Sequence, residues 1–428
     1  MAPLHRGPVL RRAVAPYIVW LLILASVVSW RRGVYFSGEL DPVVIVKAVI
    51  GVAALAAAAG SFHRGRGRLQ IGVRTLALLV LYLAIAFLGA LADGNPAASV
   101  VLSIRVLLIA VTVVLLVATY PARTLFRSLL VAMALVGLCA TASGLASVGV
   151  GGRIYGVFPP LNPNEISLLC GLPALGIVHQ LTLGNMKNRI GLPLLMALLA
   201  SVWMTGSRTG LFAFSVAVVL ILLHARQLRV GAGFALIALI PAVFFIVAGT
   251  DLVTTILERG DDSGSDLLTL NARTIAWDTV LNTPSDTWQR WVGAGLSVKQ
   301  VAVEGQYWQD QALDSSWISA LAQAGVVGTL VLAVWSLTTV ASSLAARDLR
   351  SLTTPVLAFI LVRSFLENGL VDSNVPFVVF LTVSLLVERA ATRSDYARQE
   401  TEECHSRSPS TQMPHPRGFA QQARHSSR

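Results

Sequence analysis

The sequence has few charged residues and no grouping of cysteines. Asp, Glu, Lys and Arg make up 13% of its 428 residues, whereas about 25% is usual for soluble proteins. Its three cysteines are Cys139 and Cys170 in apolar runs and Cys404 near the C-terminus, a distribution that indicates neither a disulfide framework nor a metal cluster. Nucleotide-binding glycine loops, HExxH, GxSxG and CxxC patterns are all missing, so the common soluble-enzyme templates do not apply.

Apolar residues are abundant instead, at 55% of the chain, with a mean hydropathy of +0.69. Runs near 20 apolar residues cross a hydrocarbon core about 30 Å thick. The sequence therefore predicts an all-α, polytopic transmembrane helical bundle of about twelve spans. The predicted spans are 14–30, 43–60, 71–91, 99–119, 128–148, 164–182, 190–205, 210–224, 230–249, 317–341, 354–368 and 375–388.

The net charge of +11 is explained by topology rather than by nucleic-acid binding. Basic connections such as "HRGRGR" and "HARQLR" alternate with acidic or neutral ones, and the positive-inside rule then places both termini in the cytoplasm. One connection disagrees, because "WRRGVYFSGELDP" puts Arg31 and Arg32 on the predicted outer side.

The connection over residues 250–316, here called the acidic loop, holds ten acidic and four basic residues, a net charge of −6. Within it, "LLTLNARTIAWDTVLNT" is compatible with a short amphipathic helix, so we expect a large, partly helical extracytoplasmic loop. The predicted membrane domain is 1–391, followed by a disordered cytoplasmic tail over 392–428 that is polar and almost without aliphatic residues.

Arg208, in "WMTGSRTGLFAF", interrupts an apolar stretch and lies at the predicted outer face. An arginine near the hydrocarbon core costs about 2.5–3.5 kcal/mol on insertion scales. Its small and hydroxylated neighbours favour a binding role, and an ion pair with Glu165 or Glu367 is the structural alternative. The same face receives "GGRIYGVFPPLNPNEIS", which on its own is equally well explained as a rigid turn into a helix capped by Asn162 or Asn164.

Other charges have simpler explanations. Lys47 and Arg105 lie within spans without polar neighbours, so snorkelling or a structural ion pair is favoured for both. Arg363 lies one helical turn before Glu367, a spacing that favours an internal ion pair. Arg273 has the alternative of being a solvated loop charge. Paired arginines beside a membrane suit a diphosphate, since guanidinium binds phosphate oxygens bidentately and stays charged.

Four segments together resemble the O-antigen ligase and polymerase superfamily of bacterial integral membrane proteins. In order, they are "YGVFPPLNPNEIS", "WMTGSRTGLFAF", "NARTIAWDTVLNT" followed by "VGAGL", and "LDSSWISALAQAGVVGTLVL". The resemblance implies metal-independent, cofactor-free glycosyl transfer at the outer face of the bacterial cytoplasmic (inner) membrane. It implies a polyprenyl-diphosphate-linked saccharide donor, a glycan or glycolipid acceptor, contact with membrane lipids, and partnership with other polysaccharide-assembly proteins but not with nucleic acid.

The resemblance also implies roles for individual residues. The family's paired arginines fall on Arg208 and Arg273. Family ligases commonly carry His-Asn after the large loop, where this chain has Asp314-Ser315, a departure that favours polymerase over ligase. The expected catalytic residues are therefore Arg208, Arg273 and Asp314, with no metal ligands. The expected substrate-binding residues are Arg153, Asn162, Asn164, Glu165, Ser207, Trp277 and Trp317.

Two other functions stay open on the sequence. A transporter or flippase of an anionic lipid-linked saccharide uses similar arginines, although the chain shows no inverted repeat. A non-catalytic membrane scaffold leaves Arg208 and the loop motifs unexplained.

Overall fold

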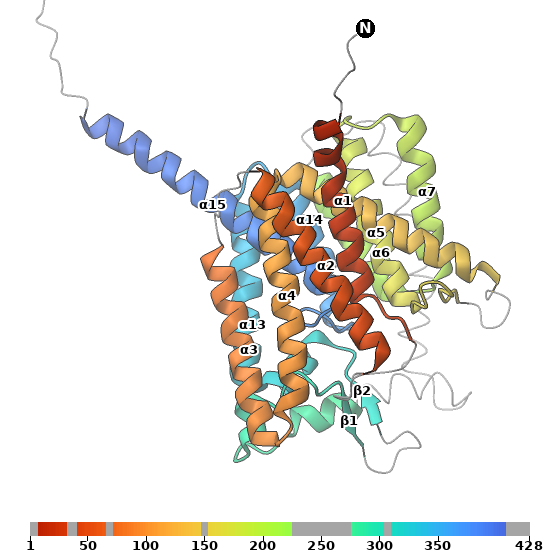
Figure 1. The fold of residues 1–428 in the computed structure, drawn as a ribbon, viewed down its shortest axis with the longest axis vertical. Helices are drawn as coiled ribbons and strands as arrows, with labels where there is room; N and C mark the ends of the chain where they lie inside the picture. The colour runs from red at the N-terminus through yellow and green to blue at the C-terminus, as the bar shows by residue number, and fades with distance from the viewer. Residues whose placement is uncertain are drawn as a thin grey trace, which may run out of the picture.

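The computed structural model describes residues 7–31, 41–65, 72–146, 153–224, 275–303 and 310–407, which are mostly helical (Figure 1). The first helices are α1 (Gly7–Val27), α2 (Pro42–Gly65), α3 (Val73–Asp93), α4 (Pro96–Thr119), α5 (Ala122–Gly144), α6 (Pro163–Thr182), α7 (Asn188–Met204) and α8 (Arg208–His224). After them come α12 (Trp288–Val292), α13 (Ser316–Ala345), α14 (Arg350–Ser364) and α15 (Val375–Arg407).

The polytopic helical class is confirmed. Six described helices, α2 to α6 and α13, are long and apolar enough to cross a membrane, and shorter apolar helices cover Val14–Val27, Asn188–Met204 and Arg208–His224. The predicted spans fall on described helices except for 230–249, which lies outside the described residues. The total of twelve spans and the N-in/C-in topology stay predictions.

Two features differ from the prediction. The chain is not purely helical, because β1 (Gln300–Ala302) and β2 (Asp310–Ala312) pair antiparallel, with Val301 opposite Gln311. Strands of three residues are too short to show an alternating pattern in the sequence. The tail predicted to be disordered from residue 392 is also partly helical, since α15 continues to Arg407 through a run of helix formers without proline or glycine.

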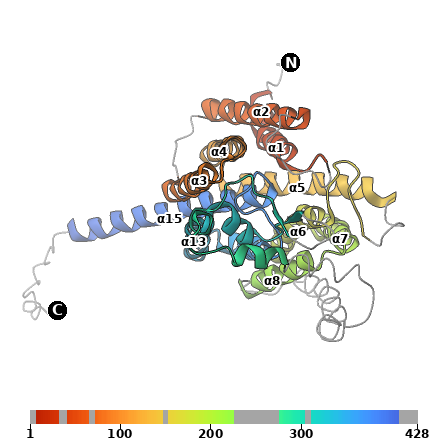
Figure 2. The same cartoon turned by 90° about the horizontal axis from the view of Figure 1, so that it is seen from below.

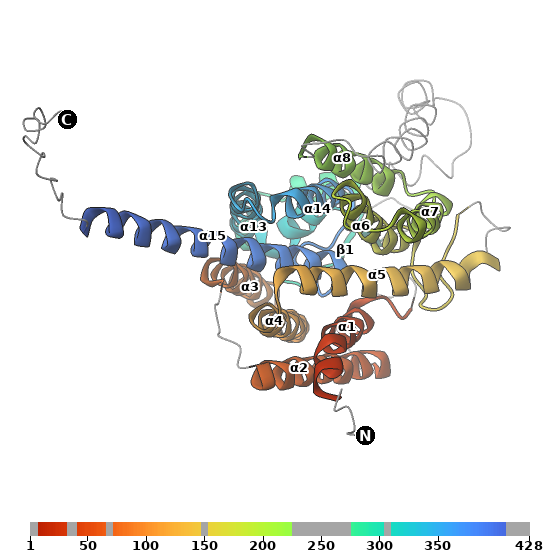
Figure 3. The same cartoon turned by 90° about the horizontal axis from the view of Figure 1, so that it is seen from above.

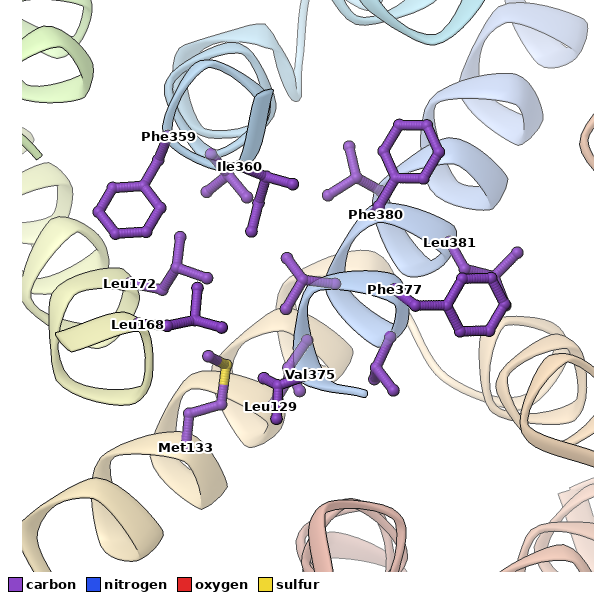
Figure 4. Close-up of a cluster of buried hydrophobic side chains, with 14 of the residues drawn as sticks. Leu129, Met133, Leu168, Leu172, Phe359, Ile360, Val375, Phe377, Phe380 and Leu381 are labelled. Carbon is purple, nitrogen blue, oxygen red and sulfur yellow. The ribbon is translucent and has the colours of Figure 1, made fainter. Parts of the chain in front are cut away.

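The helices form two groups on either side of α5 and α15. Viewed along the bundle from either end, α1 to α4 lie on one side, and α6, α7, α8, α13 and α14 lie on the other (Figures 2 and 3). Where these groups meet, side chains from α5, α6, α14 and α15 interlock in a buried cluster (Figure 4). This packing fixes the rotation of each helix and so decides which polar side chains meet at the end of the bundle.

Candidate functional site

Three connections that are distant in sequence meet at one end of the bundle, near the β1–β2 hairpin. Arg363 of α14 donates from Nη2 to the carbonyl of Asn164 at the start of α6 (3.0 Å). Ser316, at the start of α13, donates from Oγ to the carbonyl of Glu367 (2.9 Å). The end of α1 joins them through Ser29. The predicted gathering of polar segments on one face is therefore present among the described residues.

A cavity of about 520 Å³ opens between these segments. It is lined by the end of α1, by α2 and α4, by the start of α6, by the segment after β2 and by the α14–α15 connection. Its charged lining residues are Arg31, Lys47, Arg105, Glu165, Lys299, Asp314, Arg363, Glu367 and Asp372. Acidic and basic side chains therefore line the same cavity, together with several of the predicted site residues.

The start of α6 forms one wall of the cavity. Asn162 caps the helix, because its side chain accepts from the Glu165 N–H (2.8 Å) while the Glu165 carboxylate accepts from the Asn162 N–H (3.1 Å). This reciprocal capping box satisfies two amide donors of the first turn. Glu165 also accepts from the Ser29 hydroxyl (3.0 Å). The predicted capped turn is therefore present, and Asn162 and Glu165 also face the cavity.

The β1–β2 hairpin supplies another wall. The Leu313 N–H donates to the carbonyl of Lys299 (3.0 Å), continuing the ladder past both strands and bringing Lys299 and Asp314 to the cavity. Lys299 in turn forms an ion pair with Asp372 (Nζ to Oδ2, 2.7 Å). Burial alone would raise the pKa of Asp372, but the charge and hydrogen bond of Lys299, helped by the Ser373 N–H and the Arg105 charge, lower it below its ordinary value.

Arg208 does not line this cavity; it starts α8 on the turn that follows α7. Its side chain is exposed and has no hydrogen-bond or ion-pair partner among the described residues, so an ion pair with Glu165 or Glu367 is not formed there. Ser207 is buried and caps α8, accepting from the Gly210 N–H (3.3 Å). The exposed guanidinium thus stands at the positive end of a 17-residue helix.

Arg153 lies beside the same turn and connects it to the cavity. Its Nε donates to the carbonyl of Thr205 (3.1 Å), and its side chain packs over Gly206. Two residues later, Tyr155 lines the cavity wall, as Asn162 does. Arg153 and Arg208 therefore flank one short turn, and Arg153 is two residues before the cavity-lining Tyr155.

The remaining predicted residues have other positions. Trp317 donates to the Ser364 hydroxyl (3.0 Å), and its ring packs on Phe365 with centroids 5.9 Å apart, so its polar group is already bonded within the protein. Trp277 belongs to a helical segment at 275–281, and its buried Nε1 has no partner among the described groups. Neither tryptophan is among the cavity-lining residues. Arg273 lies outside the described residues.

The "VGAGL" segment packs against a break in α13. Gly325 has φ of +64° inside this helix, and a Cβ there would meet the backbone of Trp291 at 2.3 Å. Ala294 and Gly295 donate their N–H groups to the carbonyls of Ala322 and Gln323 (both 2.9 Å). A break within a membrane helix is tolerated where the freed backbone groups find partners inside the protein, as they do here.

Residues 193–333 match the family model described as O-antigen ligase (Wzy_C). This segment is similar to the O-antigen ligase family. The sequence-based assignment to the O-antigen ligase and polymerase superfamily is confirmed, and the family indicates membrane glycosyl transfer from a lipid-linked saccharide to a glycan acceptor. No curated protein and no solved structure matches the chain.

The matched segment runs from α7 into α13, so it contains Arg208, the acidic loop and Asp314 but not the start of α6. Within the described part of the chain, no group of three His, Cys, Asp or Glu side chains is placed to hold a metal ion.

Sequence reasoning missed several basic residues of the cavity. Lys47 and Arg105 were explained as snorkelling or structurally paired charges, yet both line the cavity, and Arg105 donates to the carbonyl of Ser26. Arg31 also lines it and pairs with Asp41 (2.5 Å). The sequence held a signal for each of these residues. Lys47 and Arg105 are charges within apolar runs, and Arg31 breaks the positive-inside pattern.

Proposed function

We propose that this chain is a membrane glycosyltransferase that acts at the outer face of the bacterial cytoplasmic membrane. Its donor is a saccharide on a polyprenyl diphosphate, and its acceptor is a sugar hydroxyl of a glycan or glycolipid. Polymerisation is favoured over ligation because Asp314 stands where family ligases commonly carry histidine. The observation that carries the proposal is the meeting of Asn162, Glu165 and Asp314, from distant parts of the chain, in one cavity beside the Arg208 turn.

In the proposed reaction, the acceptor oxygen forms a bond to the anomeric carbon of the donor sugar. The bond from that carbon to the diphosphate oxygen breaks, and the diphosphate leaves with the electron pair. Asp314 takes the acceptor's hydroxyl proton, which is the role of a general base. Arg208, with Arg273 and Arg153, stabilises the negative charge that gathers on the leaving diphosphate.

The other residues bind sugar in this proposal. Asn162 and Glu165 keep free acceptor capacity at the cavity wall beyond their mutual hydrogen bonds. Asn164 and Ser207 support this arrangement, since the Asn164 backbone carbonyl accepts from Arg363 and the Ser207 side-chain hydroxyl caps α8. Trp277 and Trp317 are assigned to sugar stacking on the resemblance alone, since neither lines the cavity.

The test uses the purified chain in proteoliposomes with a polyprenyl-diphosphate-linked oligosaccharide of defined mass. Longer glycan on the same lipid supports polymerisation, and transfer to a separate glycolipid acceptor supports ligation. Movement of unchanged donor between leaflets, without any change in glycan mass, refutes glycosyl transfer and favours the transporter alternative. Asp314→Asn is the matched variant, since it removes the base but keeps the size of the side chain.

A further inference from the structure

Two cations on neighbouring membrane helices face the cavity without a bound acid. Lys47 is on α2 and Arg105 is on α4, and these two helices pack against each other. The charges of the two side chains repel one another. Among the described residues, the Lys47 amine has no hydrogen-bond or ion-pair partner, and the Arg105 guanidinium donates only to the carbonyl of Ser26. A like-charge pair of this kind is costly within a membrane unless an anion lies against it.

A third cation at the cavity wall also has an unused donor. Arg363 is 4% exposed, and its Nη2 donates to the Asn164 carbonyl, but its Nη1 is buried without a hydrogen-bond partner. Burying a guanidinium donor without a partner costs about 1–3 kcal/mol or more. This is an observation independent of the Lys47–Arg105 pair.

The nearby acids attract these cations but do not accept hydrogen bonds from the unused donors within the described residues. Asp372 is held by Lys299, and the Glu165 carboxylate accepts from Ser29 and from the Asn162 N–H. Glu165 attracts both Lys47 and Arg363 through space, Glu367 attracts Arg363, and Asp372 attracts Arg105. The Arg363 Nη1 nevertheless has no hydrogen-bond partner within the described residues. The cavity therefore keeps unsatisfied cationic donors on the side formed by α2, α4 and α14.

We propose that Lys47, Arg105 and Arg363 form a subsite for a carboxylate substituent on the acceptor glycan. The inference rests on the proposed function, and it names the acceptor as an acidic saccharide. The acceptor is favoured over the donor diphosphate because Asp314, the proposed acceptor base, lines this cavity, whereas Arg208 is on the neighbouring α7–α8 turn. Guanidinium and ammonium groups together bind such oxyanions strongly through charge-assisted hydrogen bonds.

The test measures ligand-induced thermal stabilisation of the purified full chain in detergent. The probes are sodium glucuronate, glucose with sodium chloride at the same ionic strength, and sodium pyrophosphate. We expect glucuronate to raise the melting temperature by about 2 °C or more at saturation, with no shift from glucose. Equal shifts from glucose and glucuronate, or no shift from either, overturn the proposal.

Variants assign the effect to the cavity. Lys47→Met should at least halve the glucuronate shift, whereas the control Lys187→Met, an exposed lysine outside the cavity, should keep it in full. Lys47→Arg retains the charge and should keep the shift, which preserves the test if Lys47→Met fails to fold. A full glucuronate shift in Lys47→Met contradicts the proposal. A Lys47-dependent shift with pyrophosphate alone assigns the subsite to the donor and also overturns it.

This binding test is separate from the turnover test. A chain that elongates donor glycan but binds no glucuronate retains the proposed function and loses the acidic-acceptor assignment. A chain that binds glucuronate but leaves every lipid-linked glycan unchanged loses the glycosyl-transfer function.

Discussion

Replacing Arg208 with lysine tests the diphosphate role most directly, because the structure separates catalysis from stability at this position. The side chain is exposed and has no partner among the described residues, so the substitution removes no described contact within the protein. Arginine and lysine have similar helix propensities, and both keep a positive charge on the first turn of α8. We therefore expect the melting temperature of Arg208→Lys to match that of the wild type.

Turnover should fall even though the charge is kept. Lysine loses the planar fork that makes two parallel hydrogen bonds to phosphate oxygens. One charge-assisted hydrogen bond contributes about 1.5–3 kcal/mol, and about 1.4 kcal/mol of barrier changes the rate tenfold. The expected loss is therefore about tenfold to about a hundredfold, in kcat rather than in protein level.

The assay is conversion of a lipid-linked saccharide donor in proteoliposomes, with protein amounts matched by blot. Arg350→Lys is the matched control, because Arg350 is also an exposed arginine that begins a helix, α14, and it is not among the residues lining the 520 Å³ cavity. It should turn over donor at the wild-type rate. Normal turnover by Arg208→Lys would show that the residue does not hold the diphosphate.

Four further outcomes are expected. Donor conversion should survive EDTA, since arginines are proposed to stabilise the leaving diphosphate; loss with EDTA and rescue by Mg²⁺ would indicate a metal site. The next test uses the substitutions Ser285→Cys and Asn185→Cys in a background without native cysteines. A membrane-impermeant thiol reagent should label Ser285→Cys in intact spheroplasts, but Asn185→Cys only after permeabilisation. The reverse labelling order would contradict the predicted topology. Asp372→Asn should lower the melting temperature at neutral pH, and its difference from the wild type should shrink as pH falls below about 4. The reason is that folding lowers the pKa of Asp372, so the ionised carboxylate stabilises the fold above its ordinary pKa and this contribution is lost on protonation. A difference in melting temperature that does not change with pH would contradict this. Gly325→Ala should destabilise by about 1–3 kcal/mol in a denaturation series, whereas Gly60→Ala, with open space at its Cβ, should not, and equal effects would mean that the α13 break is not required.

Local features of the site were predictable from the sequence. Asn162 followed by proline and, three residues on, by Glu165 predicts a capped helix start, and the capping box is present. The predicted spans 190–205 and 210–224 placed Arg208 at a helix junction, and α8 begins at that residue. Both signals are carried by neighbours within a few positions, so no knowledge of the tertiary structure is needed to recognise them.

Membership of the cavity was not predictable in the same way. Lys47 and Arg105 have no polar neighbours in sequence, and only the packing of α2 against α4 turns both toward one chamber. Trp317 has a motif position that favours sugar stacking, yet the approach of α14 directs its indole N–H to Ser364. Hydropathy is averaged around a helix, so it does not encode which side of the helix meets a neighbour.

The helices and their membrane character follow from the order of the residues alone, because a membrane-spanning helix satisfies its own backbone and needs only enough apolar residues in a row. Short segments in a fixed order also indicated the similarity to the O-antigen ligase family. Which charges share a cavity depends instead on the fold, because it is set by the rotation and contact of helices far apart in the chain. Lys299 and Asp314 illustrate this, because the β1–β2 pair brings both residues to the cavity. Each strand has only three residues, so neither carries an alternating pattern that predicts it, and each is stabilised by pairing with the other.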